Sequence, residues 1–227
     1  MEKLVYLLFQ DPGVPGSKIR KAVVDEAVPA MRAAGASQII LHVQDEDVEA
    51  GTPVRHNDPP IRAMLSFWLQ NSDDREPCEE ALAALVPRIA GYLVAESRPL
   101  MHETNPGGRS EGMTQVCCIS RKAGLRDDDF YDIWTRDHKQ VAIETQSTTG
   151  YVRNIFVRAL TRGAPDCWVA IVEETFPIGA LSDPKVFYDA KDDAQLKANL
   201  DRMMASVNRF LDPTDMEVVH TSEYVLG

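Results

Sequence analysis

Apolar and polar positions alternate in blocks along this chain, and the blocks predict strands and helices in the same order twice. Short apolar runs rich in Val, Ile and Leu indicate buried strands, and apolar residues three or four positions apart indicate amphipathic helices. In the first half we expect strands at 4–9, 38–43, 62–70 and 96–103, and helices at 17–34 and 77–94. In the second half we expect strands at 115–120, 151–160, 168–174 and 217–225, and helices at 127–145 and 194–210.

Each half therefore has the order β-α-β-β-α-β, which is the order of a ferredoxin-like unit. The segment 104–112 is rich in Gly and is expected to be a linker, which gives a first unit at 1–103 and a second at 113–227. Helices cover only one face of such a sheet, and the other apolar face also needs a cover. The predicted fold class is therefore α+β, with two tandem ferredoxin-like units whose sheets cover each other within one chain.

The charge of the chain narrows the classes of partner. The 227 residues carry a formal net charge of −11, which argues against a nucleic-acid partner and against docking on an anionic membrane. No apolar stretch approaches the ~20 residues of a membrane-spanning helix and no signal peptide is recognised, so the cytoplasm is the expected location. The cysteines have no C-x-x-C spacing, and we expect reduced thiols, with the adjacent Cys117 and Cys118 on opposite faces of a strand.

Catalytic motifs are few, and none stands in the context that its chemistry needs. Residues 108–112 match G-x-S-x-G, but a linker precedes them and a strand follows, whereas a nucleophile elbow joins a strand to a helix. The acidic run 45–49 has oxygen donors for a cation, but such a run is ordinarily a solvated loop. We therefore predict no metal and no cofactor.

The helix predicted at 127–145 carries the most informative group of side chains. At about 100° per residue, Tyr131, Trp134 and His138 lie on one flank of this helix. A neutral imidazole can accept a proton near neutral pH, and a neighbouring carboxylate such as Asp137 can orient it. The same spacing also fits a histidine that only packs, so the spacing alone leaves both interpretations open.

Two strands offer further candidates. In the strand at 151–160, Tyr151 and Asn154 occupy opposite faces, and Tyr224 shares a face of the last strand with other polar residues. Such groups can line a pocket, where Asn154 or Tyr224 would donate a hydrogen bond to a ligand carbonyl. Ordinary cross-strand packing produces the same pattern.

At this point the second half resembles the EthD family. The segment 130–138 is similar to that family's F-x-x-x-W-x-x-x-H pattern, and the resemblance continues in order at 150–154, 181–184, 210–212 and 223–225. EthD proteins are dimeric α+β barrels, in which two ferredoxin-like units press their sheets together. The resemblance therefore implies an intramolecular barrel, with a pocket between helix and sheet and His138 as acid/base. The first-half helix departs from the pattern, since it has no His or Trp and offers only Glu26 in their place.

Three hypotheses for function follow. The first is a cofactor-independent enzyme of oxidative catabolism, of dehydratase, isomerase or oxygenase type, and any oxidoreductase label rests on family association. It would bind a small apolar or aromatic metabolite, with His138 and Asp137 as catalytic residues and a pocket lined by Tyr131, Trp134 and Tyr151. The second is a non-catalytic binding or accessory protein of a degradation pathway. The third is a haem-binding member of the barrel group. The sequence also leaves open whether the pseudo-dimeric chain assembles into a homo-oligomer.

Overall fold

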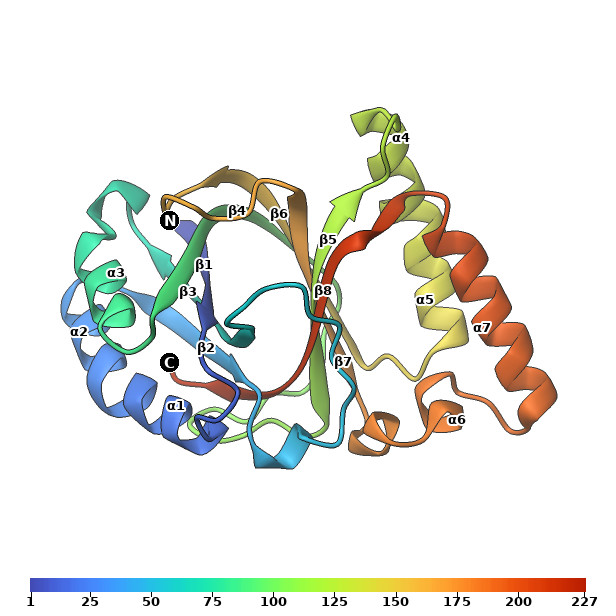
Figure 1. Cartoon of the computed structure of the whole chain (residues 1–227), viewed down its shortest axis with the longest axis horizontal. Helices are drawn as coiled ribbons and strands as arrows, with labels where there is room; N and C mark the ends of the chain where they lie inside the picture. Colours follow the sequence, from blue (N-terminus) through green and yellow to red (C-terminus); the bar gives the residue numbers. More distant parts are fainter.

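The computed structural model describes residues 1–227, and its centre is a closed barrel of eight antiparallel strands (Figure 1). Around the barrel the strands follow the order β1-β3-β2-β8-β5-β7-β6-β4. The strands are β1 Glu2–Phe9, β2 Ser37–Val43, β3 Ile61–Leu69, β4 Arg88–Leu100, β5 Met113–Arg121, β6 Gly150–Ala159, β7 Trp168–Phe176 and β8 Leu211–Val225. The α-helices are α1 Gly16–Ala22, α2 Val28–Ala33, α3 Glu76–Ala83, α4 Asp127–Asp132, α5 Lys139–Thr145, α6 Pro184–Phe187 and α7 Asp193–Val207. Shorter helical turns are η1 Val23–Ala27, η2 Glu46–Val48, η3 Ser72–Asp74, η4 Ile133–His138 and η5 Ile178–Leu181.

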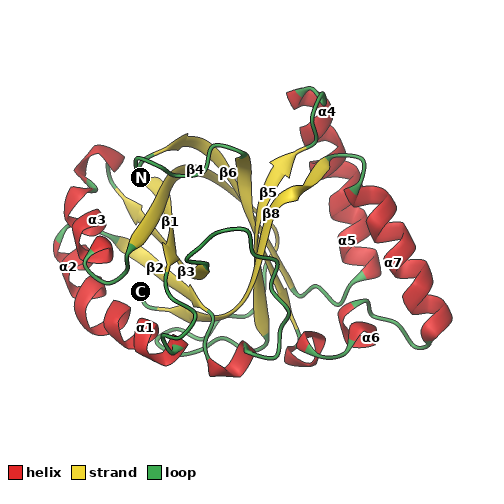
Figure 2. Ribbon diagram, viewed as in Figure 1, coloured by secondary structure: helices red, strands yellow, loops and turns green.

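The two halves of the chain share one strand order. The first-half sheet runs β4-β1-β3-β2 and the second-half sheet runs β8-β5-β7-β6, so each half has the ferredoxin-like arrangement. Two long strands join the halves, because β4 pairs with both β1 and β6, and β8 pairs with both β5 and β2. The helices lie outside the barrel, α1–α3 beside the first half and α4–α7 beside the second (Figure 2). The predicted fold class, two tandem ferredoxin-like units closing one α+β barrel, is confirmed.

Alternation along the strands separates a core inside the barrel from cores under the helices. In β1, Val5 and Leu7 belong to the inner core, whereas Tyr6 faces the helices of the first half. In β5, Cys118 belongs to the inner core and Cys117 to the core under the second-half helices, as predicted for this pair. The inner core takes residues from both halves, so each sheet buries the inner face of the other.

The helix predicted at 77–94 is wrong in its second half, where the chain forms β4. Pro87 removes a backbone donor after α3, and the apolar residues that follow pair with β1. Gly91 lies where β4 crosses the ring of Tyr6, and a Cβ there would come within 2.3 Å of that ring. Long-range strand pairing therefore overrides a segment whose local spacing also suits a helix.

A π-helical turn interrupts the first long helix of each half. The turn η1 joins α1 to α2 just before Pro29, and η4 joins α4 to α5 and contains Trp134 and His138. Such turns are frequent at functional sites, since they displace side chains from the regular helical spacing. The two helices share this local geometry, but only the second carries the Trp/His pair.

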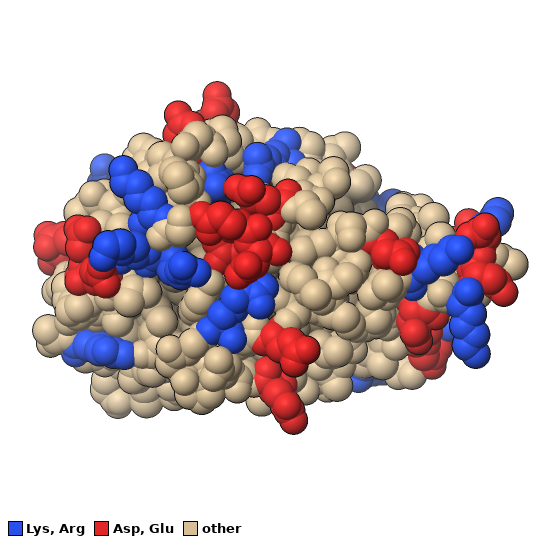
Figure 3. All heavy atoms as spheres, turned by 90° about the horizontal axis from the view of Figure 1, so that it is seen from below, with Lys and Arg blue, Asp and Glu red and all other residues tan.

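The surface has no continuous basic region on the face drawn in Figure 3, where Lys and Arg lie in small groups beside Asp and Glu. None of the helices has the length and apolar character needed to cross a bilayer. The segment 104–112 lies along the end of β8, where Pro106 pairs with Val225 and Arg109 pairs with Tyr224. This contact ties the segment between the halves to the last strand.

Candidate functional site

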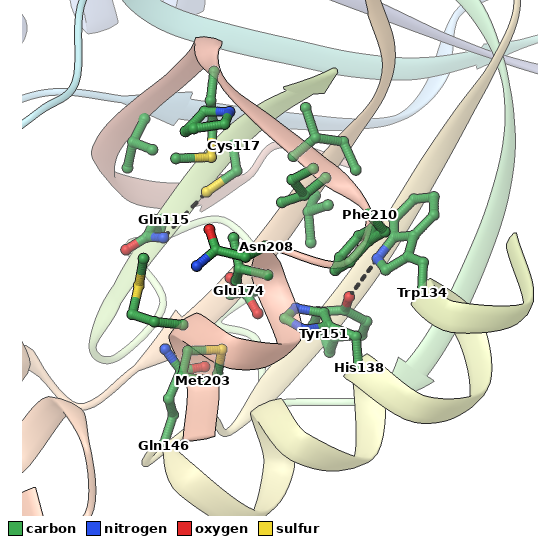
Figure 4. Close-up of a pocket in the computed structure, with 18 of the residues that line it drawn as sticks. Gln115, Cys117, Trp134, His138, Gln146, Tyr151, Glu174, Met203, Asn208 and Phe210 are labelled. Atoms are coloured by element: carbon green, nitrogen blue, oxygen red, sulfur yellow. Dashed lines mark hydrogen bonds between the residues drawn. The ribbon is translucent and has the colours of Figure 1, made fainter. Parts of the chain in front are cut away.

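A cavity lies between the outer face of the second-half sheet and the helices that cover it (Figure 4). Its volume is about 260 Å³, and most of its lining is apolar, contributed by strands β5–β8 below and by η4 and α7 above. Mostly apolar cavities with a few convergent polar groups are typical of small-molecule sites. The side chains with hydrogen-bonding or titratable groups that line it include those of Gln115, His138, Gln146, Tyr151, Glu174, Tyr188 and Asn208.

His138 reaches this cavity from the π-helical turn η4 and is only 8 % exposed. Its Nδ1 lies 3.0 Å from the Ser206 hydroxyl on α7, and its ring packs against Phe210 with 4.7 Å between centroids. Burial lowers the pKa of His138 to about 4, with a smaller contribution from the positive charge of Arg209. The side chain is therefore a neutral imidazole near pH 7, and its Nε2 makes no hydrogen bond within the chain.

Asp137 does not orient this imidazole. Its carboxylate is exposed and accepts a hydrogen bond from Arg209 Nη2 at 2.8 Å, on the outer side of the helix. Consecutive residues of a helix project about 100° apart, so Asp137 points away when His138 points inward. Ser206 takes the orienting position that we had predicted for Asp137.

Trp134 and Tyr151 meet in the lining of the cavity, as Figure 4 shows. The indole Nε1–H of Trp134 donates to the Tyr151 hydroxyl at 2.9 Å, and both side chains are buried. The Tyr151 hydroxyl keeps its own proton free for another acceptor. Tyr131 is half-buried and packs beside Trp134 with 6.5 Å between ring centroids, but it does not line the cavity.

Asn154 lies outside the cavity, in the barrel interior. It sits three residues from Tyr151 on β6, and alternation turns it to the opposite face of the sheet. There its Oδ1 accepts from Lys3 Nζ at 2.8 Å, and its Nδ2 donates to Glu173 at 2.7 Å. Burial acts to raise the pKa of Glu173, but Lys3 and His42 outweigh it and hold the pKa below its usual range. Asn154 is thus part of a buried polar network, and we no longer expect it to touch a ligand in the cavity.

Tyr224 is also remote from the cavity. In its last residues β8 has passed from β5 to β2, so Tyr224 belongs to the core of the first half. Its hydroxyl donates to Asp45 at 2.7 Å, and the guanidinium of Arg20 lies over its ring at 4.9 Å. The acidic loop residue Asp45 is therefore buried and paired, rather than part of a solvated run.

Glu174, which no sequence motif singles out, lies in the floor of the cavity. On β7 it stands opposite Gln115 of β5 and Tyr151 of β6, so three polar side chains form one row across the sheet. Figure 4 shows its carboxyl between these two neighbours. The side chain is 9 % exposed and makes no hydrogen bond or ion pair within the chain, and burial raises its pKa to about 7. The available signal was alternation, which places Glu174 on the same face as Val172 and opposite to Glu173.

The corresponding space in the first half is filled by apolar side chains. A core of 20 buried residues, including Met31, Phe67 and Leu82, packs between the sheet and α1–α3. The core under the second-half helices has 10 buried residues, which leaves room for the cavity. Glu26 is exposed on η1 and is not among the residues that line the cavity.

The residues of the cavity do not suit haem. No Lys or Arg lines it to pair with propionates, and about 260 Å³ is below the roughly 300–1,000 Å³ of pockets for drug-sized ligands. No group of three or more His, Cys, Asp or Glu side chains is placed to hold a metal ion. Ser110 of the G-x-S-x-G match is buried and donates to Glu223 at 2.6 Å, so a carboxylate separates it from His102, which contacts the same oxygen.

Comparison with known proteins identifies the fold. A monooxygenase candidate from Lactobacillus acidophilus NCFM is similar over 100% of this chain and 96% of its own, with a TM-score of 0.51 and 8% identity. An anthrone oxidase-like protein is similar over 100% of this chain and 91% of its own, with a TM-score of 0.53 and 11% identity. No model of a protein family and no curated protein sequence matches the chain. At these identities the likeness is one of fold, and the chain has the dimeric α+β barrel fold within a single polypeptide.

Proposed function

We propose that this chain is an EthD-like, cofactor-independent enzyme that binds a small apolar or aromatic metabolite and moves a proton at His138. The observation that carries the proposal is the cavity itself, a mostly apolar space of about 260 Å³ into which a neutral imidazole and several polar groups converge. The ordered EthD segments of the second half support the same site, because the helix with Trp134 and His138 covers it.

Three groups at the cavity have a chemical task in this proposal. Ser206 holds Nδ1 of His138, so Nε2 is the atom that would exchange a proton or a hydrogen bond with the substrate. Trp134 donates to the Tyr151 oxygen, which strengthens the Tyr151 O–H as a donor toward a substrate carbonyl. Apolar neighbours supply most of the binding area.

Proton transfer of this kind serves dehydration, isomerisation and cofactor-free oxygenation. The first two need one proton removed from carbon and one delivered to oxygen or to another carbon. For oxygenation, removal of a proton from a phenol or an enolisable ketone produces the electron-rich anion that reacts with O₂. An oxidative setting accords with the EthD resemblance and with the names of two structural neighbours.

The test is turnover of a panel of uncharged aromatic ketones and phenols, followed by mass spectrometry of products and by O₂ uptake. We expect at least one compound to be converted, and His138→Ala to lose the conversion. His56→Ala is the matched control, because the His56 side chain is exposed and does not line the cavity, and it should keep full activity. Turnover that survives His138→Ala would refute the assignment of the proton to this residue.

A second outcome separates the enzyme from an accessory protein. If ligands bind, if Trp134→Ala weakens their binding and if no compound is converted, the chain is a binding protein of a degradation pathway. Mass spectrometry of a co-purified ligand would identify a compound that the panel lacks. A Soret band in the purified protein would contradict the cofactor-independent proposal directly.

A further inference from the structure

We infer that Glu174 makes the cavity selective for uncharged ligands that carry a hydroxyl or carbonyl oxygen, and that it excludes carboxylates. The inference rests on the proposed function only in taking the cavity as a ligand site. The inference specifies the class of ligand and identifies Glu174 as the residue that selects it.

The geometry of Glu174 leaves its carboxyl without a partner inside the protein. Buried polar side chains in folded proteins are nearly always hydrogen-bonded. Glu174 sits in the middle of the row with Gln115 and Tyr151, and neither side chain bonds to it. Gln115 instead donates to the sulfur of Cys117, and Tyr151 accepts from Trp134. A ligand oxygen in the cavity would supply the hydrogen-bond partner that Glu174 lacks within the chain.

The other titratable groups that line the cavity stay uncharged near neutral pH. Burial raises the pKa of Cys117, Tyr151 and Tyr188, so these groups stay protonated, and it lowers the pKa of His138 to about 4, so this group stays neutral. From α7 the cavity receives Asn208 and apolar side chains, and from β8 only apolar ones. Glu174 is therefore the group in the lining that changes charge near pH 7.

Two guanidinium groups lie close to residues of the lining, and neither pairs with Glu174. Arg209 is paired with Asp137 on the outer side of the helix, and Arg153 lies over the Trp134 ring with its Nε on Ser97. Neither lines the cavity. A ligand carboxylate would thus face a second carboxylate in a lining without a cation, and like charges placed together repel, so this ligand is disfavoured.

A phenol or ketone meets no such repulsion. When Glu174 is protonated its O–H donates to the ligand oxygen, and when it is ionised it accepts from a ligand hydroxyl. A phenol is therefore held in both states, since its own O–H can reverse direction. The preference for a phenol over a carboxylate should consequently grow as Glu174 ionises, whereas a ketone, which cannot donate, is bound through Glu174 only while the carboxyl is protonated.

The experiment compares 1-naphthol with 1-naphthoate, two ligands of similar shape and different charge, by isothermal titration at about pH 6 and about pH 8. With the unaltered protein we expect naphthol to bind with similar affinity at both values, and naphthoate to bind up to about tenfold more weakly at the higher pH, because fewer molecules then carry a protonated Glu174. In Glu174→Gln the affinity for naphthoate at the higher pH should rise about tenfold and its pH dependence should vanish. Glu144→Gln on α5, whose carboxylate is exposed, is the matched control and should leave the ratio of the two affinities unchanged.

Circular dichroism establishes that each variant is folded before binding is measured. A naphthoate affinity equal to that of naphthol in the unaltered protein, or an unchanged ratio in folded Glu174→Gln, overturns the inference. Binding with the expected selectivity but without turnover would leave the inference standing and refute the catalytic proposal. Failure of both ligands to bind would overturn both proposals, because the cavity would then not be a ligand site.

Discussion

Replacement of Glu174 by glutamine should make the protein more stable at neutral pH. The unfolded chain releases the Glu174 proton near pH 4.5, whereas burial raises the folded pKa to about 7. Between these values the unfolded state ionises and the folded state does not, so the folded state loses stability as pH rises. Below pH 4.5 both states are protonated and the residue has no such effect. Glutamine cannot ionise, so the variant does not lose stability in this way as the pH rises.

The size of the gain follows from the difference between the two pKa values. That difference corresponds to a ceiling of about 3 kcal/mol above pH 7, reached once the folded carboxyl has also ionised. The amide of glutamine also loses contact with water in this cavity, which offsets part of the gain. This offset is the same at every pH, so we expect Glu174→Gln to stabilise the protein by about 2–3 kcal/mol more at pH 8 than at pH 5.

The neighbouring residue is the matched control, because Glu173 and Glu174 point to opposite faces of β7. Glu173 faces the barrel interior, where Lys3 Nζ lies 3.7 Å from its carboxylate and its pKa is held low. Its contribution to stability is present above its unfolded pKa and is lost as pH falls, the reverse of Glu174. Glu173→Gln should destabilise by about 3 kcal/mol at pH 8, since it leaves buried Lys3 with less compensation.

Urea denaturation followed by circular dichroism, at pH 5 and pH 8, measures the free energy of unfolding of both variants. The reasoning is refuted if Glu174→Gln is destabilising at pH 8, or if its effect is the same at both values. It is also refuted if the two glutamine variants change stability in the same direction at pH 8.

Three further predictions concern stability and use the same urea assay. Lys3→Met should destabilise by about 3–5 kcal/mol, because it leaves Glu173 buried without its cation, and a loss under 1 kcal/mol would contradict the network. Tyr151→Phe should cost about 1–3 kcal/mol, because the buried Trp134 N–H loses its acceptor, and an unchanged free energy would mean that another acceptor replaces it. Gly112→Ala should destabilise the protein by at least about 1 kcal/mol, because φ at this position is +85° and a Cβ would come within 2.3 Å of a backbone oxygen. An unchanged free energy of unfolding would show that the backbone around residue 112 shifts to make room.

Much of the fold was predictable because it depends on patterns that are local in the sequence. Nearly all strands and helices follow directly from apolar runs and helical spacing. Closure into a barrel followed from one physical requirement, that each sheet has an uncovered apolar face. The error at 77–94 has a different origin, since the choice of strand over helix there depends on pairing with β1, more than 70 residues away in sequence. Spacing alone could not decide it.

The site was predictable only as far as one element determines it. Trp134 and His138 share a helix flank, so their joint presence in the cavity follows from spacing. Asn154 and Tyr151 were both named as pocket residues, although three-residue spacing on a strand places them on opposite faces, and the structure puts only Tyr151 in the cavity. Ser206 comes from a helix 68 residues away in sequence, and no local pattern marks its contact with the imidazole.

The difference between the halves is a matter of packing as well as of residue identity. Both halves have the same strand order and a π turn in the first helix, so both could form a space between helix and sheet. In the first half Met31, Phe67 and Leu82 fill that space, whereas in the second the cavity stays open beside His138. Introducing a histidine and a tryptophan into the first half would therefore not by itself create a second site, because the apolar core already packs between the sheet and the helices. Under the proposed function, this asymmetry would place ligand binding in one half and leave the other half to complete the barrel. We accordingly propose that 1–103 serves as a structural unit and 113–227 as the functional one.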